Sequence, residues 1–272
     1  GARGMKLALP WLAPEADAPF PPVSRALARP NGLLAAGGGL EPERLLRAYR
    51  LGIFPWYSPG EPILWWSPDP RCVFHTAAMH VPRRLRAWLR KCDWDIAADR
   101  DFEGVIDACA APRGEGEGTW ITAEMRAAYV ALHRLGHAHS IEVREGPTLA
   151  GALYGVVLGR MFYAESMVSR LPGGSKVALL ALARALSHWG FPLIDAQVSS
   201  AHLHTLGATL MPRAEFLASA RELAAAPFPS GNWAERFPRI APAELADAGA
   251  DAASRTGVGV PQSRASRPPG RS

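Results

Sequence analysis

Residues 161–198 decide the fold, and they read MFYAESMVSRLPGGSKVALLALARALSHWGFPLIDAQV. Apolar runs predict strands over Met161–Met167 and Pro192–Val198. The longer apolar segment between them predicts a helix over about Ser175–Trp189, which ends at Gly190. A strand, a crossover helix and a second strand in one sheet form a right-handed parallel unit. The sequence therefore predicts two parallel strands whose carboxyl ends lie at one edge of a sheet.

Polar side chains interrupt both of these apolar strands. Glu165 lies near the carboxyl end of the first strand, and Asp195 and Gln197 are two residues apart on the second, so they share a face. Ligands of open α/β sheets bind outside the carboxyl ends of parallel strands. We therefore expect the three side chains to converge on a site. Two ordinary alternatives stay open, namely strand carboxylates on a solvated face and one buried ion pair.

The rest of the chain supplies further helices and strands around this unit. Prolines make residues 10–32 extended, and a helix is expected to follow from Pro42 to a stop at Gly52. Residues 53–71 combine prolines with a cluster of tryptophans, which excludes a helix there. The remaining predicted elements are helices over about Pro82–Lys91 and Ala123–Leu135, and strands over His139–Val143 and Leu149–Leu158.

Composition is that of a water-soluble globular protein, with 48% hydrophobic and 20% charged residues among 272. The longest apolar runs are far shorter than the roughly 20 residues that span a bilayer, and the N-terminus lacks the apolar core of a signal peptide. Three cysteines without a Cys-x-x-Cys pair favour a reducing cytoplasm. Residues 241–272 contain no aromatic residue and are mostly small or polar, so we expect a disordered tail there.

Several motifs rich in Trp, Pro and Gly follow one another between about residues 20 and 220. They are Pro30-Asn-Gly-Leu-Leu-Ala-Ala-Gly-Gly38, Gly52-Ile-Phe-Pro-Trp56, Pro62-Ile-Leu-Trp-Trp-Ser-Pro-Asp-Pro-Arg71, Gly118-Thr-Trp-Ile-Thr122, Gly136-His-Ala-His-Ser-Ile-Glu-Val143, Glu165-Ser-Met167, Ser175-Lys176 and Leu193-Ile-Asp-Ala-Gln197. In order and spacing they resemble the bacterial leucyl/phenylalanyl-tRNA–protein transferases. The resemblance implies an α+β protein with a small N-terminal domain (1–69) and a larger acetyltransferase-like (GNAT) domain with a mixed sheet (70–240), followed by the tail (241–272).

The implied activity moves Leu or Phe, and in some cases Met, from an aminoacyl-tRNA to the α-amino group of a protein that begins with Arg or Lys. The product would carry an N-degron and go to proteolysis. The expected partners are thus the 3′ end and acceptor stem of an aminoacyl-tRNA and proteins with N-terminal Arg or Lys. We expect a cytoplasmic monomer that contacts no membrane.

The implied chemistry needs neither a metal nor a cofactor, because an aminoacyl ester is already activated for conversion to an amide. The sequence lacks the Gly-x-x-x-x-Gly-Lys-Ser/Thr pattern of a nucleotide-binding loop. His137-x-His139 and His202-x-His204 have ligand types, but no third ligand is evident in the sequence. We therefore expect no metal. No Ser-His-Asp or Cys-His pattern is visible either, which argues against a covalent acyl-enzyme.

The expected catalytic residues are Asp195, Gln197 and Glu165. The attacking α-amine has a pKa near 7.7–8.0, so positioning can supply much of the catalysis. Gln197 can hydrogen-bond the amine, and Asp195 can orient Gln197 or accept the departing proton through water. A cationic first residue of the acceptor requires carboxylates, and Glu165 and Asp195 are the candidates.

The donor needs three further surfaces, and the resemblance supplies candidates for two of them. It implies a hydrophobic pocket of Leu153, Phe162, Met167, Leu179 and Ile194 for the aminoacyl side chain, and Trp56 and Trp120 for stacking on the terminal adenosine. The tRNA body requires cations, and the predicted helix over residues 82–91 carries Arg83, Arg84, Arg86, Arg90 and Lys91. Each surface also has an ordinary structural explanation. The pocket residues can simply be part of the hydrophobic core, and the tryptophans can pack between the two domains. The cations of the helix can form a solvated face that binds nothing.

Two other functions fit parts of the sequence. Arg170-Leu-Pro-Gly-Gly-Ser175 is close to the pyrophosphate loop of coenzyme A–dependent GNAT N-acyltransferases. A non-enzymatic RNA-binding module would keep the basic helix and the tryptophans, and the overall charge of +5 permits it. Neither alternative uses all of Glu165, Asp195, Gln197 and the tryptophans.

Overall fold

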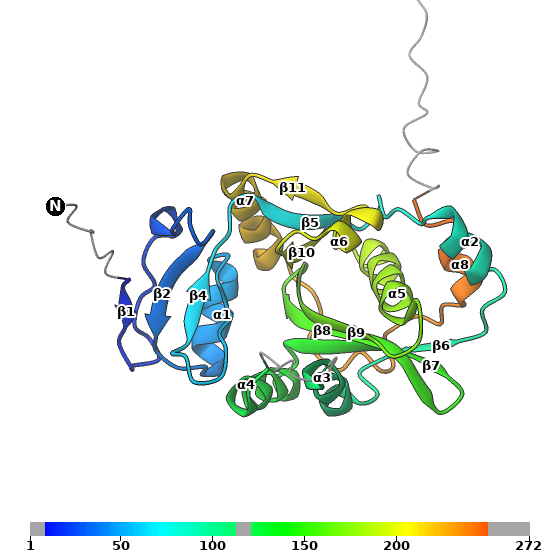
Figure 1. The fold of residues 1–272 in the computed structure, drawn as a ribbon, viewed down its shortest axis with the longest axis horizontal. Coiled ribbons are helices and arrows are strands. Elements are labelled where there is room, and N and C mark those ends of the chain that lie inside the picture. The colour runs from blue at the N-terminus through cyan, green and yellow to red at the C-terminus, as the bar shows by residue number, and fades with distance from the viewer. Residues whose placement is uncertain (1–8, 113–120, 250–272) are drawn as a thin grey trace, which may run out of the picture.

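The computed structural model describes residues 9–112 and 121–249, and their strands form two sheets (Figure 1). The smaller sheet is N-terminal and has the strand order β1-β2-β4-β3. Helix α1 packs beside it, and a short 3-10 turn lies at Val23–Arg25. The bounds are β1 Trp11–Leu12, β2 Leu33–Gly37, α1 Pro42–Arg50, β3 Phe54–Pro55 and β4 Leu64–Trp66.

The larger sheet has the strand order β11-β5-β10-β9-β8-β7-β6 among the described residues. Neighbouring strands are antiparallel except β9 and β10, which are parallel, as predicted for residues 161–198. The α+β class with a mixed sheet is thereby confirmed. The strands are β5 Arg71–His75, β6 Asp95–Ala98, β7 Ala138–Glu145, β8 Thr148–Leu158, β9 Met161–Ser169, β10 Leu193–Gln197 and β11 Thr209–Met211.

Helices cover both faces of this sheet (Figure 1). The long helix α5, Gly174–His188, packs on one face, and α3 (Phe102–Ala110) and α4 (Ala123–Arg134) pack on the other. The remaining helices are α2 Arg83–Leu89, α6 Ala201–Thr205, α7 Arg213–Ala225 and α8 Pro242–Leu245. In the part of the chain that the structure describes, none of these helices has the length and apolarity needed to cross a membrane.

Helix α5 lies so close to the sheet because glycines meet at its first turn. A Cβ atom on Gly151 of β8 would overlap the backbone of Gly174, and a Cβ on Gly174 would overlap the backbone of Ala150. Side chains at either position would push α5 away from the sheet. The two glycines therefore set the height at which the first turn of α5 stands above β8.

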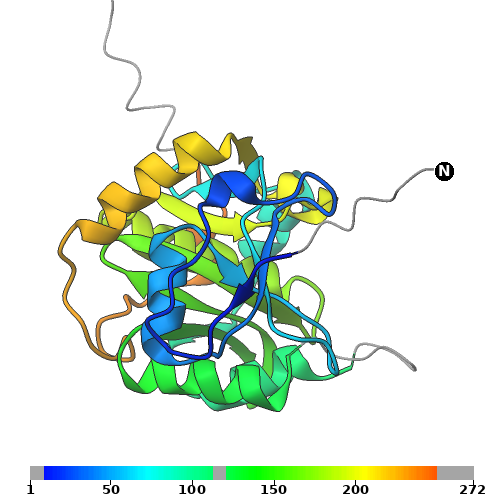
Figure 2. The same ribbon diagram turned by 90° about the vertical axis from the view of Figure 1, so that its left-hand side faces the viewer.

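The N-terminal sheet packs against the larger domain through α1. Figure 2 shows α1, in blue, between α7 in gold above it and α4 in green below it, and α1 contacts both helices. One apolar cluster runs from Leu45 and Trp65 into Met125 of α4 and Val156 of β8. The chain passes from one sheet to the other between Trp66 and Arg71, and the predicted domain boundary after residue 69 falls in this link. The boundary itself stays a prediction.

The expectation of a disordered tail from residue 241 is wrong for residues 241–249. A short helix, α8, begins there at Pro242 and packs against α5 and α2. Leu245 and Ala246 are fully buried. The carboxylate of Glu244 accepts the backbone N–H of Ala241 at 2.6 Å. Averaging composition over the whole stretch hid this short apolar helix, and residues 250–272 lie outside the described part.

We predict that Leu245→Ala lowers the free energy of unfolding by about 2–5 kcal/mol, because it removes a fully buried side chain. Leu135→Ala is the matched control, since Leu135 is 59% exposed and its truncation should change stability by less than about 0.5 kcal/mol. Urea unfolding of both variants measures the difference. Equal stability of the two variants would mean that α8 is not docked.

Candidate active site

The candidate site forms where the parallel strands β9 and β10 separate. Their pairing covers only Ile194 opposite Phe162 and Asp195 opposite Tyr163. Beyond these pairs, toward the carboxyl ends, the two strands no longer share a ladder. Side chains from both strands can therefore point into the space between them.

Strand β9 carries an extra residue just after the paired segment. Opposite β8, Tyr154 faces Ser166 and the next residue, Gly155, faces Ala164, so Glu165 is the additional residue of a β-bulge. A bulge redirects the side chain of the extra residue and interrupts strict alternation. It explains why Glu165 points into the site.

Strand β10 is irregular at the equivalent place. Opposite β5, Asp195 faces Val73 and Gln197 faces Cys72, so Ala196 is the additional residue. Gln197 has a φ of 62°, which lies in the left-handed region that non-glycine residues rarely adopt. The prediction that Asp195 and Gln197 share a face by simple alternation is therefore wrong. Asp195 is fully buried, whereas Gln197 is partly exposed at the end of its strand.

Gln197 and Glu165 meet, as predicted. The Gln197 Nε2 donates a hydrogen bond of 3.0 Å to Oε1 of Glu165. The hydroxyl of Tyr49, from α1, donates to the same oxygen, and the hydroxyl of Tyr129, from α4, lies 2.6 Å from that of Tyr49. With its amide N–H₂ group turned to Glu165, Gln197 presents its carbonyl oxygen as an acceptor. The carboxyl group is thus held by side chains from both domains.

The surroundings of Glu165 favour its protonated form. Burial raises the pKa of Glu165 to about 8, and the nearby carboxylate of Asp195 adds to this, although the hydrogen bonds from Tyr49 and Gln197 act in the opposite direction. Burial also raises the pKa of Tyr49 well above its usual value, so this phenol stays a hydrogen-bond donor. At neutral pH Glu165 is therefore poised to exchange a proton.

A cavity of about 210 Å³ opens above this pair of side chains. It brings together three of the predicted residues, Trp56, Glu165 and Gln197. Trp56 is 47% exposed and packs against Trp66, whose indole N–H donates to the Trp56 carbonyl at 2.7 Å. Trp120 lies outside the described residues. The lining consists of Phe54, Pro55, Trp56, Glu165, Ala196, Gln197 and Val198.

Asp195 does not line this cavity but lies beneath it. Its carboxylate is fully buried and accepts two hydrogen bonds from Arg71, at 2.9 Å from Nε and 2.7 Å from Nη2. Its Oδ1 also accepts the backbone N–H of Gln197 at 2.9 Å. The buried ion pair that the sequence left open as an alternative is thus present. A direct contact between Asp195 and an acceptor side chain does not fit this burial.

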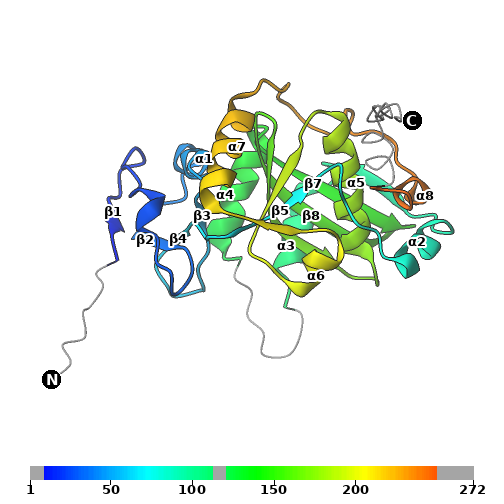
Figure 3. The same cartoon turned by 90° about the horizontal axis from the view of Figure 1, so that it is seen from above.

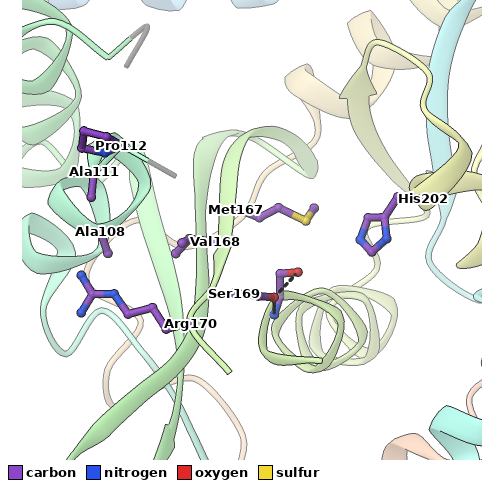
Figure 4. Close-up of a pocket in the computed structure, with 9 residues that line it drawn as sticks. Ala108, Ala111, Pro112, Met167, Val168, Ser169, Arg170 and His202 are labelled. Atoms are coloured by element: carbon purple, nitrogen blue, oxygen red, sulfur yellow. Dashed lines mark hydrogen bonds between the residues drawn. The ribbon is translucent and has the colours of Figure 1, made fainter. Parts of the chain in front are cut away.

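A second cavity, of about 490 Å³, lies beside the first turn of α5. Figure 4 shows Met167 pointing into it from β9 toward His202, with Ser169 above the helix end and Pro112 on the opposite side. Ser169 Oγ accepts the backbone N–H of Ser175 at 2.8 Å. Met167 is the predicted aminoacyl-pocket residue that this cavity exposes.

The other four predicted pocket residues lie in the core between the sheet and α5. Leu153, Phe162, Leu179 and Ile194 are each at most 2% exposed and line neither of the two cavities. The bulge at Glu165 brings Phe162 and Met167 to the same face of β9, although they are five positions apart and strict alternation would place them on opposite faces. These four residues are thus packed as ordinary core residues, which was the alternative that the sequence left open. Their role in binding an aminoacyl group stays a prediction.

The basic helix α2 lies at the opposite end of the molecule from β1–β4 (Figures 1 and 3). Arg86 is partly buried and donates to the carbonyl oxygens of Ala246 and Val81, and Arg90 is ion-paired with Asp247. Trp88 faces Gly173, just before α5, which connects this end with the second cavity. The exposed cations are Arg83, Arg84, Arg90 and Lys91.

A cluster of two histidines and an aspartate lies elsewhere in the larger domain. The carboxylate of Asp99 forms a hydrogen bond of 2.6 Å with Nδ1 of His139. It also accepts hydrogen bonds from the backbone N–H groups of Ser140 and Trp233, at 2.9 and 2.8 Å. His133 binds a backbone carbonyl through Nδ1 at 2.8 Å, and the His139 ring stacks on Trp233. The Nδ1 atoms of both histidines and both oxygens of Asp99 are thus engaged in hydrogen bonds. The cluster fastens the C-terminal segment to β7, and the expected lack of a metal stays a prediction.

Sequence reasoning missed several residues of the site. The sequence places Tyr49 in the apolar stripe of α1, and nothing in a helical stripe distinguishes a core tyrosine from one that binds a carboxyl group. Arg71 did leave a signal, because a cation directly precedes the apolar run Cys-Val-Phe of a buried strand. A charge at that position requires a buried partner.

The protein is thus an α+β protein with a hydrogen-bonded carboxyl–amide pair in a cavity between two domains. Sequence comparison gives its family. The family described as leucyl/phenylalanyl-tRNA protein transferase matches residues 73–221, and its N-terminal domain matches residues 38–69. The chain belongs to this family. It is therefore an aminoacyltransferase, as the sequence motifs predicted.

Named relatives agree with this assignment. The leucyl/phenylalanyl-tRNA–protein transferase of Xanthomonas oryzae pv. oryzae is 56% identical over 237 residues, which cover 87% of this chain and 95% of the relative. The transferase of Xanthomonas euvesicatoria pv. vesicatoria is 58% identical over 227 residues, which cover 83% of this chain and 91% of the relative. The transferase of Xylella fastidiosa is 56% identical over 213 residues, which cover 78% of this chain and 88% of the relative.

A solved structure, L-PGS from Bacillus licheniformis, matches with a TM-score of 0.34 and 12% identity over 63% of this chain and 57% of that chain. At this level the similarity carries no argument about the fold.

We predict that Glu165 makes stability depend on pH in a defined direction. Its carboxyl group loses a proton near the ordinary value of 4.5 when unfolded and near 8 when folded, so the folded state holds the extra proton in between. The contribution of Glu165 to stability is therefore complete below about pH 4.5 and disappears as the pH rises through about 8.

Thermal melting of wild type and Glu165→Gln between pH 5 and pH 9 measures this contribution. The melting temperature of wild type should fall relative to that of Glu165→Gln as the pH rises. The exposed Glu235→Gln is the control and should follow wild type at every pH. A constant difference between wild type and Glu165→Gln would contradict the shifted carboxyl pKa.

Proposed function

We propose that this protein transfers Leu or Phe from an aminoacyl-tRNA to the α-amino group of proteins that begin with Arg or Lys. The observation that carries the proposal is the Glu165–Gln197 pair at the floor of a cavity edged by Trp56, in a chain that belongs to the transferase family. The cavity provides a carboxyl group for a cation, an amide for an amine and an aromatic ring for a base.

In this proposal Glu165 recognises the cationic first residue of the acceptor. A guanidinium or ammonium group would displace the proton from the carboxyl group and form a charge-assisted hydrogen bond. Asp195 would not touch the acceptor, because its carboxylate is fully buried and bound to Arg71. Its role would be to hold the backbone of Gln197 and to add negative charge beneath the site.

Gln197 would orient the attacking amine. Its carbonyl oxygen can accept an N–H of the α-amine while its amide group stays bound to Glu165. The amine nitrogen forms the new C–N bond to the aminoacyl carbonyl carbon, and the bond from that carbon to the ribose oxygen of the tRNA breaks. The proton that leaves the amine is balanced by the one that the departing ribose oxygen gains.

The donor would enter between the two domains. Trp56 and Trp120 would stack on the terminal adenosine, Met167 would contact the aminoacyl side chain in the second cavity, and Leu153, Phe162, Leu179 and Ile194 would border it from the core. The tRNA body would extend toward α2, whose Trp88 lies next to the first turn of α5. Arg86 would contribute less than its neighbours because two carbonyl oxygens already bind it.

The remaining expectations follow from the family. The arrangement of β9, α5 and β10 supports a GNAT-like topology for the larger domain. Transfer would create an N-degron, and a cytoplasmic location agrees with three cysteines that form no Cys-x-x-Cys pair. A monomer stays a prediction. Family membership favours aminoacyl-tRNA over coenzyme A as the donor, although residues 170–175 do lead into the first turn of α5, which begins at Gly174.

The experiment that tests the proposal supplies leucyl-tRNA and a peptide with N-terminal Arg, followed by mass spectrometry. We predict that the peptide gains one leucine residue, and that the same peptide with an acetylated α-amine gains none. Acetyl-CoA replaces leucyl-tRNA in a parallel reaction. Acetylation of the peptide together with no leucine transfer would favour the coenzyme A–dependent alternative.

We further predict that Arg83→Ala/Arg84→Ala weakens tRNA binding and reduces its salt dependence. Removing one cation that binds a phosphate should lower the slope of log K against log salt by about 0.9, so the double change lowers it by up to about 2 units. Arg221→Ala is the matched control, because Arg221 is an exposed arginine on α7, remote from α2 in Figure 1. Filter binding at several salt concentrations measures the slope. If log K against log salt has the same slope for both variants, the cations of α2 do not bind tRNA and only face solvent.

A further inference from the structure

We infer that Arg71 is a positioning residue that holds Gln197, through Asp195, in the conformation needed for transfer. The inference rests on the proposed function of Gln197 and adds a residue that would touch neither substrate. It depends on an unbroken series of contacts from the guanidinium group of Arg71 to the backbone of Gln197.

The first contact is a two-pronged ion pair. Arg71 Nε and Nη2 donate to the two carboxylate oxygens of Asp195 at 2.9 and 2.7 Å, and neither side chain is exposed to solvent. A bidentate arginine–carboxylate pair fixes the plane of the carboxylate as well as its distance. Lysine can keep the charge at this position but not the planar fork.

The guanidinium group is itself held from three sides. Its Nη1 donates to the carbonyl oxygen of Gly52 at 2.9 Å. The ring of Phe54 lies 5.0 Å from the guanidinium carbon, and the ring of Phe216 lies 4.6 Å from it. Gly52 and Phe54 belong to the N-terminal domain, whereas Phe216 belongs to α7. Arg71 is thus fixed by two segments outside its own strand.

Asp195 passes this constraint to Gln197. Its Oδ1, which binds Arg71 Nε, also accepts the backbone N–H of Gln197 at 2.9 Å. Gln197 adopts a φ of 62°, an unfavourable conformation that persists only where surrounding contacts enforce it. Because the carboxylate cannot rotate, the hydrogen bond to Gln197 has a fixed direction. The amide of Gln197 is thereby aimed at Glu165 and the cavity.

The same guanidinium group also supports the opposite wall of the cavity. Gly52 and Phe54 lie four and two positions before Trp56, and Phe54 lines the cavity together with Trp56 and Gln197. A shift of Arg71 would therefore move the group that orients the amine relative to the ring proposed to stack on the adenosine. Misplacement of this kind lowers the rate of the transfer step and leaves the binding of distant parts of the tRNA unchanged.

The test compares Arg71→Lys with Arg44→Lys. Arg44 is equally buried and donates to several backbone carbonyl oxygens, but its partners are Glu41 and residues 13–15 of the N-terminal domain. Both variants should lose thermal stability. Only Arg71→Lys should lower kcat for leucine transfer to an Arg-peptide, by about 10- to 100-fold, with KM for leucyl-tRNA within about twofold of wild type. Equal kcat values for the two variants would overturn the inference.

A second arm asks whether Arg71 acts through Gln197. In the background Gln197→Ala, Arg71→Lys should lower kcat by less than about twofold further, because the group that it positions is already absent. If the loss of kcat in the double variant instead equals the product of the losses in the two single variants, Arg71 acts independently of Gln197. That result would overturn the inference while leaving the proposed function intact.

If Arg71→Lys does not fold, Arg71→Met/Asp195→Asn replaces it. This double change removes both buried charges together and keeps an oxygen that can accept the Gln197 N–H, so it should fold. We expect the same loss of kcat, and wild-type kcat in this variant would overturn the inference. No transfer by the wild-type protein would instead overturn the proposed function, and the inference with it.

Discussion

The parting of β9 and β10 is the constraint on which the rest of the site depends. Two parallel strands that stay paired would satisfy each other's backbone groups and leave no room between them. Here the ladder ends after Asp195 opposite Tyr163, and a bulge follows on each strand. The freed space is filled by polar side chains, which need partners because they are largely buried. Tyrosines from α1 and α4 supply those partners for Glu165, and Arg71 supplies them for Asp195.

Much of this arrangement follows from the sequence, because its strongest signals are local. The segment 161–198 has apolar runs of the right length for strand, helix and strand, and the handedness of such a unit is nearly invariant. The convergence of Glu165 and Gln197 was therefore predictable. Resemblance to the transferase family added the roles, and the family match agrees with it.

The parts that were not predicted depend on contacts between distant segments. A bulge changes the facing of one residue without a signature in composition, so neither the redirection of Glu165 nor the left-handed conformation of Gln197 was foreseeable. Helix α8 is only four residues long, and its burial is decided by α2 and α5. The sequence marks Asp195 as important, but only the fold shows that its partner is Arg71, 124 residues away.

The shared core between the two sheets has a consequence for how this family can diversify. Tyr49, Gly52 and Phe54 come from the N-terminal part, yet each contacts a side chain of the larger domain. Tyr49 binds Glu165, and Gly52 and Phe54 contact Arg71. Recombination that exchanges the N-terminal part between distant homologues would join mismatched halves of one cavity and its hydrogen bonds, even if both halves folded. The gene segments on either side of residue 70 are therefore expected to be inherited together, as a single evolutionary unit.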